Sequence, residues 1–193
     1  MKRVLAIDPV ARGFGFAVLD GPKLLVDWGV RATKPSPRPV ERALREVAAL
    51  LERYSPDRVV VEDCHDGYAR RGKRSQRLIE RIVTLAGKRG IPVRRISRAG
   101  LRRAFVPEHA RTKYQIALAT VRRFPELAVR LPPIRKPWMS EPAQMGVFDA
   151  VAFALAFYTR RRSAHDDKSA AVTVSALNGS ETVPSIMRRR QIA

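Results

Sequence analysis

The chain has 193 residues, 45% of them hydrophobic, which is the size of one globular domain with a substantial core. Its 38 Lys and Arg outnumber its 18 Asp and Glu, and the formal net charge of +20 at pH 7 predicts a polyanionic partner, nucleic acid before an anionic membrane surface. The single cysteine, Cys64, excludes a disulfide framework and a cysteine-based zinc site and fits a cytoplasmic protein, and the longest nearly apolar run, residues 150–158, is too short to cross a bilayer.

The first part of the chain predicts an antiparallel meander of three strands. Residues 3–7 alternate up to Asp8, and residues 14–20 and 23–30 read as two further strands joined by a Gly-Pro turn. A proline-rich break follows. Apolar side chains then recur at the i, i+3, i+4 and i+7 spacing, which predicts an amphipathic helix over residues 40–51.

Strands and helices alternate in the next part. Residues 55–63 open with a turn and predict a β-branched strand that ends in acidic residues. A helix is expected over residues 74–88, and residues 90–96 predict a fifth strand. A meander followed by alternating elements predicts an α/β fold, a mixed five-stranded sheet with helices on its faces.

The remaining elements are helical or irregular. Ser97 and Thr112 are expected to cap two helices, which run to about Ala104 and Phe124. Residues 127–144 are rich in proline and predict a loop, and the last helix is expected over about residues 143–160. From residue 163 the composition loses its periodicity, so we expect a disordered tail over residues 163–193.

Three carboxylates stand out against this basic background. Asp8 ends the first predicted strand and Glu62 the fourth, so both side chains emerge at one sheet edge if these strands are parallel neighbours. Asp149 lies in a strongly apolar helix, where a charge is costly unless it is paired or bound to a cation. Taken singly, Asp8 before proline is also typical of a turn, and Glu62 of a solvated strand end. Together, clustered carboxylates predict Mg²⁺ binding, and two such ions roughly 3.5–4 Å apart promote phosphodiester cleavage.

A basic stretch follows the strand that ends in Glu62. Residues 67–103 contain thirteen Lys or Arg and one acid, Glu80. We expect this stretch to hold DNA phosphates beside the carboxylates, through Arg70, Arg71, Lys73 and Arg74, with a steep dependence on salt. The alternative is a solvated basic helix face.

Two further features have weaker functional interpretations. The Gly-Phe-Gly segment at residues 13–15 matches a phosphate-binding loop, but a lone Gly-x-Gly is a weak signal. Trp138 stands in a basic, proline-rich loop, where it either contacts a partner or is simply exposed.

Five segments together resemble the RuvC-type Holliday-junction resolvases of the ribonuclease-H-like superfamily. They follow the family's order from about residue 3 to residue 160, and they are residues 5–20, 56–63, 70–93, 112–117 and 148–157. The resemblance implies a ribonuclease-H-like nuclease domain over residues 1–162, dependence on Mg²⁺ or Mn²⁺ with two ions, and a homodimer. It also implies paired nicks in a four-way DNA junction that leave 5′-phosphate and 3′-hydroxyl ends.

The resemblance also assigns roles to individual residues. By motif, Asp8 and Glu62 match the strand carboxylates of the family and Asp149 matches its last-helix Asp, so these three are the expected catalytic residues and metal ligands. Lys113 looks like the lysine of a Lys-x-Gln motif, and Arg102 falls near a second basic position of the family.

Two positions depart from the family pattern. Three residues before Asp149, where the family carries a further Asp or His ligand, this chain has Gly146, for which Asp63 or Glu141 would have to compensate. Where the family has a Phe that wedges into the junction, this chain has His65, with Tyr68 nearby. The complete set of expected DNA contacts is Arg12, His65, Tyr68, Arg70, Arg71, Lys73, Arg74, Arg102 and Lys113.

The predicted function is therefore a metal-dependent endonuclease that resolves branched DNA in recombination and repair. The helix over residues 74–88 is the expected dimer interface, and no membrane association is expected. One alternative is a related nuclease that acts on RNA or on flap and replication structures. Another is a non-cleaving nucleic-acid binder of the same fold, which Gly146 favours.

Overall fold

A mixed five-stranded sheet in the order β3-β2-β1-β4-β5 forms the centre of the molecule. The computed structural model describes residues 2–32, 37–64, 71–136 and 138–159, all of which belong to one compact unit, Met1–Arg160. The predicted tail over residues 163–193 lies outside the described residues. The strands are β1 (Arg3–Val10), β2 (Gly13–Asp20), β3 (Leu25–Ala32), β4 (Arg58–Glu62) and β5 (Val93–Ile96).

The strand pairing confirms the predicted fold class. β1, β2 and β3 pair antiparallel, as expected for a meander, whereas β1 pairs parallel with β4 and β4 pairs parallel with β5. β1 does not end at Asp8 as expected. It continues to Val10, because a two-residue turn brings the chain straight back and pairs Val10 with Gly13.

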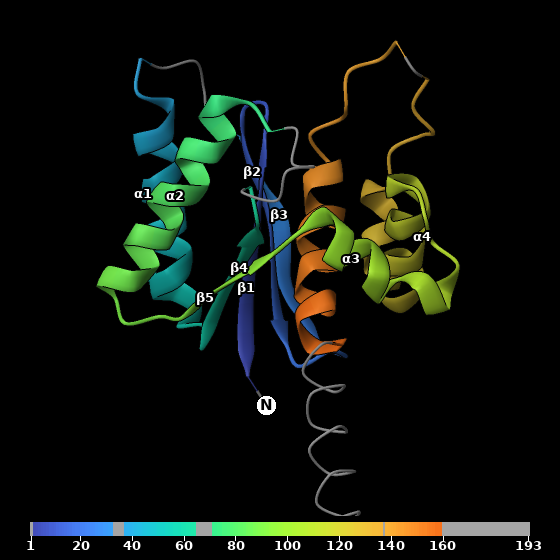
Figure 1. Cartoon of the computed structure of the whole chain (residues 1–193), viewed down its shortest axis with the longest axis horizontal. Helices are drawn as coiled ribbons and strands as arrows, with labels where there is room; N and C mark the ends of the chain where they lie inside the picture. Colours follow the sequence, from blue (N-terminus) through green and yellow to red (C-terminus); the bar gives the residue numbers. More distant parts are fainter. Residues whose placement is uncertain (1, 33–36, 65–70, 137, 160–193) are drawn as a thin grey trace, which may run out of the picture. The chain divides into compact units, whose positions relative to one another are not determined.

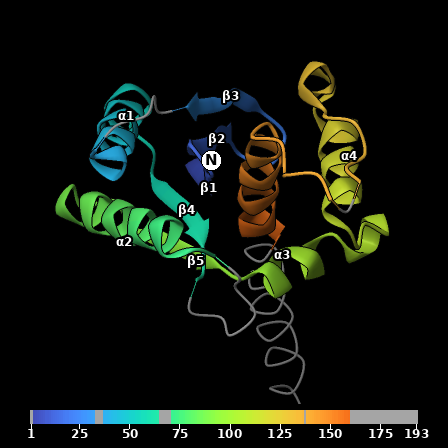
Figure 2. The same ribbon diagram turned by 90° about the horizontal axis from the view of Figure 1, so that it is seen from above.

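Helices cover both faces of this sheet (Figures 1 and 2). α1 and α2 lie on one face, and the helix over residues 145–159, orange in Figure 1, lies on the other face together with α3 and α4. Within the described ranges, every helix is too short or too polar to span a membrane. The bounds are α1 (Pro39–Tyr54), α2 (Lys73–Lys88), α3 (Arg98–Ala104) and α4 (Lys113–Arg123), with 3-10 turns at Val106–Glu108 and Pro125–Arg130.

The predicted caps place the starts of two helices near the carboxyl edge of the sheet. The Ser97 hydroxyl accepts a hydrogen bond from the Gly100 amide at 3.1 Å and starts α3 directly after β5. Thr112 and Gln115 form a reciprocal capping box at the start of α4. A loop was predicted over residues 127–144, but its first residues belong to the 3-10 helix Pro125–Arg130, in which Leu127 is fully buried against the core.

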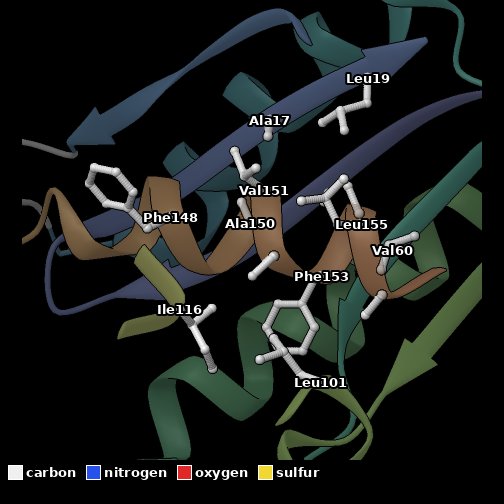
Figure 3. Packing of buried hydrophobic residues seen from close by; sticks show 14 of the residues in the cluster. Ala17, Leu19, Val60, Leu101, Ile116, Phe148, Ala150, Val151, Phe153 and Leu155 are labelled. Atoms are coloured by element: carbon white, nitrogen blue, oxygen red, sulfur yellow. The ribbon is translucent and has the colours of Figure 1, made fainter. Parts of the chain in front are cut away.

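The larger core cluster lies between the sheet and the 145–159 helix (Figure 3). Phe148 and Phe153 are almost completely buried, and each such side chain contributes roughly 1.5–3 kcal/mol of hydrophobic stabilisation. Ala150 and Ala154 are also fully buried and let the helix approach the sheet closely. This packing fixes the helix, and with it Asp149, against the strands that carry the other two acids.

Candidate active site

The three predicted acids come together at the carboxyl edge of β1 and β4. Ile7 pairs with Val61 across the parallel strands, so Asp8 and Glu62 are the next residues on each strand. Asp149 reaches the same place from the 145–159 helix. All three are buried, with exposed fractions of 1% for Asp8, 1% for Glu62 and 2% for Asp149. Carboxylates this deep require a cation or hydrogen-bond donors.

Arg98, the first residue of α3, contacts all three carboxylates at once. Its Nε donates to Glu62 Oε1 at 2.9 Å, its Nη1 lies 3.1 Å from Asp149 Oδ1, and its Nη2 lies 3.3 Å from Asp8 Oδ1. The guanidinium also lies over the Phe153 ring, 5.1 Å from its centre. The planar fork of arginine is suited to bridge several carboxylates in this way.

Arg71 approaches the same acids from the segment before α2. Its Nε donates to Glu62 Oε2 at 2.6 Å, its Nη1 donates to the Pro9 carbonyl at 2.6 Å, and its Nη2 bonds Asp8 Oδ1. The sequence predicted that Arg71 binds DNA phosphate. In this structure its guanidinium is paired with the two strand acids, and its contact with DNA stays a prediction.

Lys113 lies on the other side of Asp149. Its Nζ is 2.7 Å from Asp149 Oδ2 and also pairs with Glu141, which precedes the 145–159 helix. The capping box at Thr112 sets the position of Lys113, because it fixes the first turn of α4.

The pKa values of Asp8 and Asp149 are shifted in opposite directions. Burial, together with repulsion from Asp149, raises the pKa of Asp8 to about 7 despite the attraction of nearby cations. Burial alone would also raise the pKa of Asp149, but Arg98 and Lys113 outweigh it and lower that pKa. Burial opposes the charge of Arg98 too, and the surrounding carboxylates more than compensate, so its pKa rises. Asp8 is therefore the acid of this pair that takes up a proton first.

A pocket of about 730 Å³ opens onto this cluster. Its walls come from the end of β4, from α3 and from the start of α4. Acidic and basic side chains share its lining, which suits an anionic ligand held beside a cation-binding notch. The charged lining residues are Glu62, Arg71, Arg98, Arg102, Arg111, Lys113, Glu141 and Asp149.

The glycines near the site have structural roles. A Cβ added at Gly146 would lie 2.5 Å from Val10 Cγ1, and one added at Gly15 would lie 2.6 Å from the Val147 nitrogen and closer still to the Gly146 carbonyl group. The first turn of the 145–159 helix thus lies directly on β2. Gly13 has φ of 115°, where its missing side chain leaves room for the backbone of β3. Close packing accounts for the Gly-Phe-Gly segment without a phosphate loop.

The other predicted contacts divide into three groups. Arg102 lines the pocket, and Lys113 lies within the acid cluster. Arg12, Lys73 and Arg74 are exposed on the surface. His65, Tyr68 and Arg70 lie outside the described residues, so the predicted wedge position is not described.

Sequence reasoning did not single out Arg98 or Arg111. Arg98 was counted only as part of the basic stretch over residues 67–103. A positional signal was present: β5 ends at Ile96, and the carboxyl ends of neighbouring parallel strands meet at one sheet edge, so a residue two positions later lies beside Glu62.

The three acids supply the donor atoms that a divalent cation needs. Carboxylate oxygens are the ligands that Mg²⁺ and Mn²⁺ prefer, and all three acids surround one guanidinium group. In the part of the chain that the structure describes, no three Asp, Glu, His or Cys side chains stand together as a metal-ligand set. Arg71 and Arg98 each contact more than one of the acids. The acids therefore fit a divalent cation because they are carboxylates and lie close together. The cation can enter when the guanidinium groups of Arg71 and Arg98 move aside.

The strand order, the parallel β1–β4 pair and the helices on both faces define a ribonuclease-H-like fold. Among solved structures, this fold is similar to that of RuvC. No family model matches the sequence, and no curated protein matches it significantly.

Three solved structures are similar to the chain. RuvC of Thermus thermophilus, in a structure described as in complex with Holliday junction substrate, has a TM-score of 0.62 and 21% identity over 84% of this chain and 96% of RuvC. A second T. thermophilus RuvC structure has a TM-score of 0.62, 22% identity and the same coverage. The yeast mitochondrial Holliday junction resolvase Ydc2 has a TM-score of 0.55 and 16% identity over 82% of this chain and 78% of Ydc2. The resemblance predicted from the sequence is thus confirmed in the fold.

Proposed function

We propose that this chain is a metal-dependent, structure-selective DNA endonuclease that resolves four-way junctions by paired nicks. The observation that carries the proposal is the convergence of three buried acids from β1, β4 and the 145–159 helix in a RuvC-like fold. The junction substrate in the T. thermophilus RuvC structure supports branched DNA as the substrate class.

Asp8, Glu62 and Asp149 are the residues that would hold Mg²⁺ or Mn²⁺. Such an ion supplies activation of a water molecule and stabilisation of the leaving oxygen in phosphodiester cleavage. Two ions remain our expectation. Gly146 offers no side chain for the second, and Glu141, on the pocket wall beside Lys113, is the acid placed to help hold it.

The remaining pocket residues are suited to bind and orient DNA. Among the described residues, Arg102 and Arg111 line the pocket and form no ion pair with a carboxylate, and phosphate oxygens are natural partners for such groups. Lys73 and Arg74, exposed at the start of α2, extend the basic surface. This distribution favours a duplex arm that runs from the pocket toward α2.

The other expectations from the sequence belong to the same proposal. Paired nicking requires two active sites, so we propose a homodimer that uses α2 as its interface. We also propose that residues 1–162 form the nuclease domain, with the tail over residues 163–193 outside it. We further propose a cytoplasmic location, which the single cysteine of the chain fits.

The decisive experiment is a cleavage assay with labelled four-way junction, flap, duplex and RNA substrates in Mg²⁺ or Mn²⁺. We expect symmetric nicks near the junction centre. Asp8→Asn, Glu62→Gln and Asp149→Asn should each lower the cleavage rate by at least about 10³-fold while DNA binding persists, because each removes a ligand charge. Glu52→Gln, an exposed acid on α1, is the matched control and should cleave like the wild type.

The same assay tests the alternatives. Preferred cleavage of flaps or RNA would contradict the junction assignment and support the related nuclease. Tight junction binding without cleavage in either metal would support the non-cleaving binder, which Gly146 and the paired arginines favour. Full activity of Asp149→Asn would remove that residue from the proposed site.

A further inference from the structure

The acid cluster is already supplied with positive charge by the chain itself. When all three carboxylates are ionised they carry three negative charges, and within the described ranges three cationic side chains contact them: Arg71, Arg98 and Lys113. Buried ions of one sign are tolerated only when paired. These three cations offset the three acids before any other cation enters, although Lys113 is shared with Glu141.

Arg98 and a divalent ion would use the same oxygens. The guanidinium contacts both oxygens of Glu62, both oxygens of Asp149 and Oδ1 of Asp8, all at 2.9 to 3.3 Å. Mg²⁺ binds oxygen at roughly 2.0–2.1 Å and repels a neighbouring guanidinium. Arg71 likewise bonds both strand acids. The Arg98 guanidinium and a divalent ion cannot both lie between the three acids, so the entry of the ion requires the departure of the guanidinium.

Both arginines have a route out of the cluster. Their side chains are 17% exposed for Arg71 and 20% exposed for Arg98, and both line the pocket that opens to solvent. The same pocket holds Arg102 and Arg111, so a guanidinium that turns outward joins a basic wall suited to phosphate.

We propose that Arg98, assisted by Arg71, is an exchangeable counter-ion: it neutralises the three acids in the free protein and moves to the DNA phosphate when the metal is loaded. This inference rests on the proposed function and deepens it. Because the exchange gives phosphate a partner only after the acids have received another cation, metal and DNA bind cooperatively, each raising the affinity for the other.

The test measures competition between Arg98 and the metal, without DNA and without cleavage. The thermal midpoint of unfolding is followed in EDTA and across a Mn²⁺ titration for wild type and Arg98→Ala. In EDTA the variant should unfold at a lower temperature, since its acids have lost a counter-ion. Mn²⁺ should restore it, with a half-saturating concentration about tenfold lower than in the wild type, within the range typical of coupled sites.

Two further variants make the result specific. Arg98→Lys keeps the charge but cannot bridge three acids, so it should fold and bind Mn²⁺ severalfold more tightly than wild type; it decides the question if Arg98→Ala does not fold. Arg89→Ala breaks a surface pair with Glu52 and should leave the Mn²⁺ response unchanged.

Each outcome has one meaning. Unchanged or weaker Mn²⁺ binding in both Arg98 variants would overturn the exchange, even if the wild type cleaves junctions. The opposite result is also possible: the Arg98 variants bind Mn²⁺ more tightly, but the wild type cleaves none of the DNA or RNA substrates. That result would support the exchange and refute the proposed nuclease.

Discussion

Arginine–carboxylate pairs occur in two opposite settings in this molecule. On the α1–α2 side, Arg89 Nη2 lies 2.8 Å from Glu52 Oε1, and the Glu52 side chain is 71% exposed. At the sheet edge, Arg98 meets carboxylates whose side chains are only 2–3% exposed. Water solvates Arg89 and Glu52 whether their pair is formed or broken. The buried carboxylates have no water to replace Arg98 when that contact is lost. Arginine–carboxylate contacts of similar length, 2.8 Å and 2.9 to 3.3 Å, therefore imply very different energies.

The largest expected effect comes from breaking the buried network. Arg98→Ala should lower the free energy of unfolding by about 3–5 kcal/mol without divalent cations, because it leaves carboxylates buried without their shared cation. Urea unfolding in EDTA measures this loss. A loss below about 1 kcal/mol would mean that the acids are already solvated and that the comparison between the two settings fails.

The second effect concerns the backbone contact that supports the site. Gly15→Ala should destabilise the protein by about 1–3 kcal/mol, since its Cβ would press on the first turn of the 145–159 helix. Gly87→Ala, in α2, is the matched control: nothing lies within 4 Å of the added Cβ, and helix propensity predicts a gain of up to about 1 kcal/mol. Equal effects of the two changes on thermal unfolding would contradict the close approach.

A smaller effect is expected at the start of α4. Thr112→Ala removes the hydroxyl that accepts from the Gln115 amide and should cost about 1 kcal/mol. Since the cap also fixes Lys113, the cleavage rate should fall more than it does for Glu52→Gln, the surface control on α1. A rate unchanged from wild type would show that Lys113 needs no such support.

The smallest effect belongs to the exposed pair. Arg89→Ala should change the free energy of unfolding by less than about 1 kcal/mol, and added salt should shrink even that difference. Chemical denaturation at low and high salt checks it. A loss as large as that for Arg98→Ala would mean that burial does not separate the two settings.

Much of this arrangement could be predicted from the sequence. The apolar runs before Asp8 and Glu62 indicated two strands, and the alternation of strands and helices indicated a mixed sheet. That these two strands are parallel neighbours was only a condition until the structure showed the pairing. Asp149 was recognisable because a charge among apolar helical residues needs a partner. Local patterns of this kind carry enough information to place elements and to find unusual charges.

The features that the sequence did not reveal depend on the direction of side chains and on contacts between residues far apart in the chain. Charge counting did not indicate that Arg71 and Arg98 turn toward the acids, because a count cannot tell an arginine that turns inward from one in solvent. The contact between Gly15 and Gly146 joins residues 131 positions apart (146 minus 15) and has no local pattern. The 3-10 helix at residues 125–130 depends on the burial of Leu127, again a tertiary effect.

The contact at Gly146 limits how this site can be altered. A carboxylate introduced there alone would collide with Val10 before it reached the other acids. Redesign toward a four-acid site would thus require a smaller residue at position 10 and a shift of the helix away from β2. Acquiring that extra ligand therefore involves the 145–159 helix and β1 together.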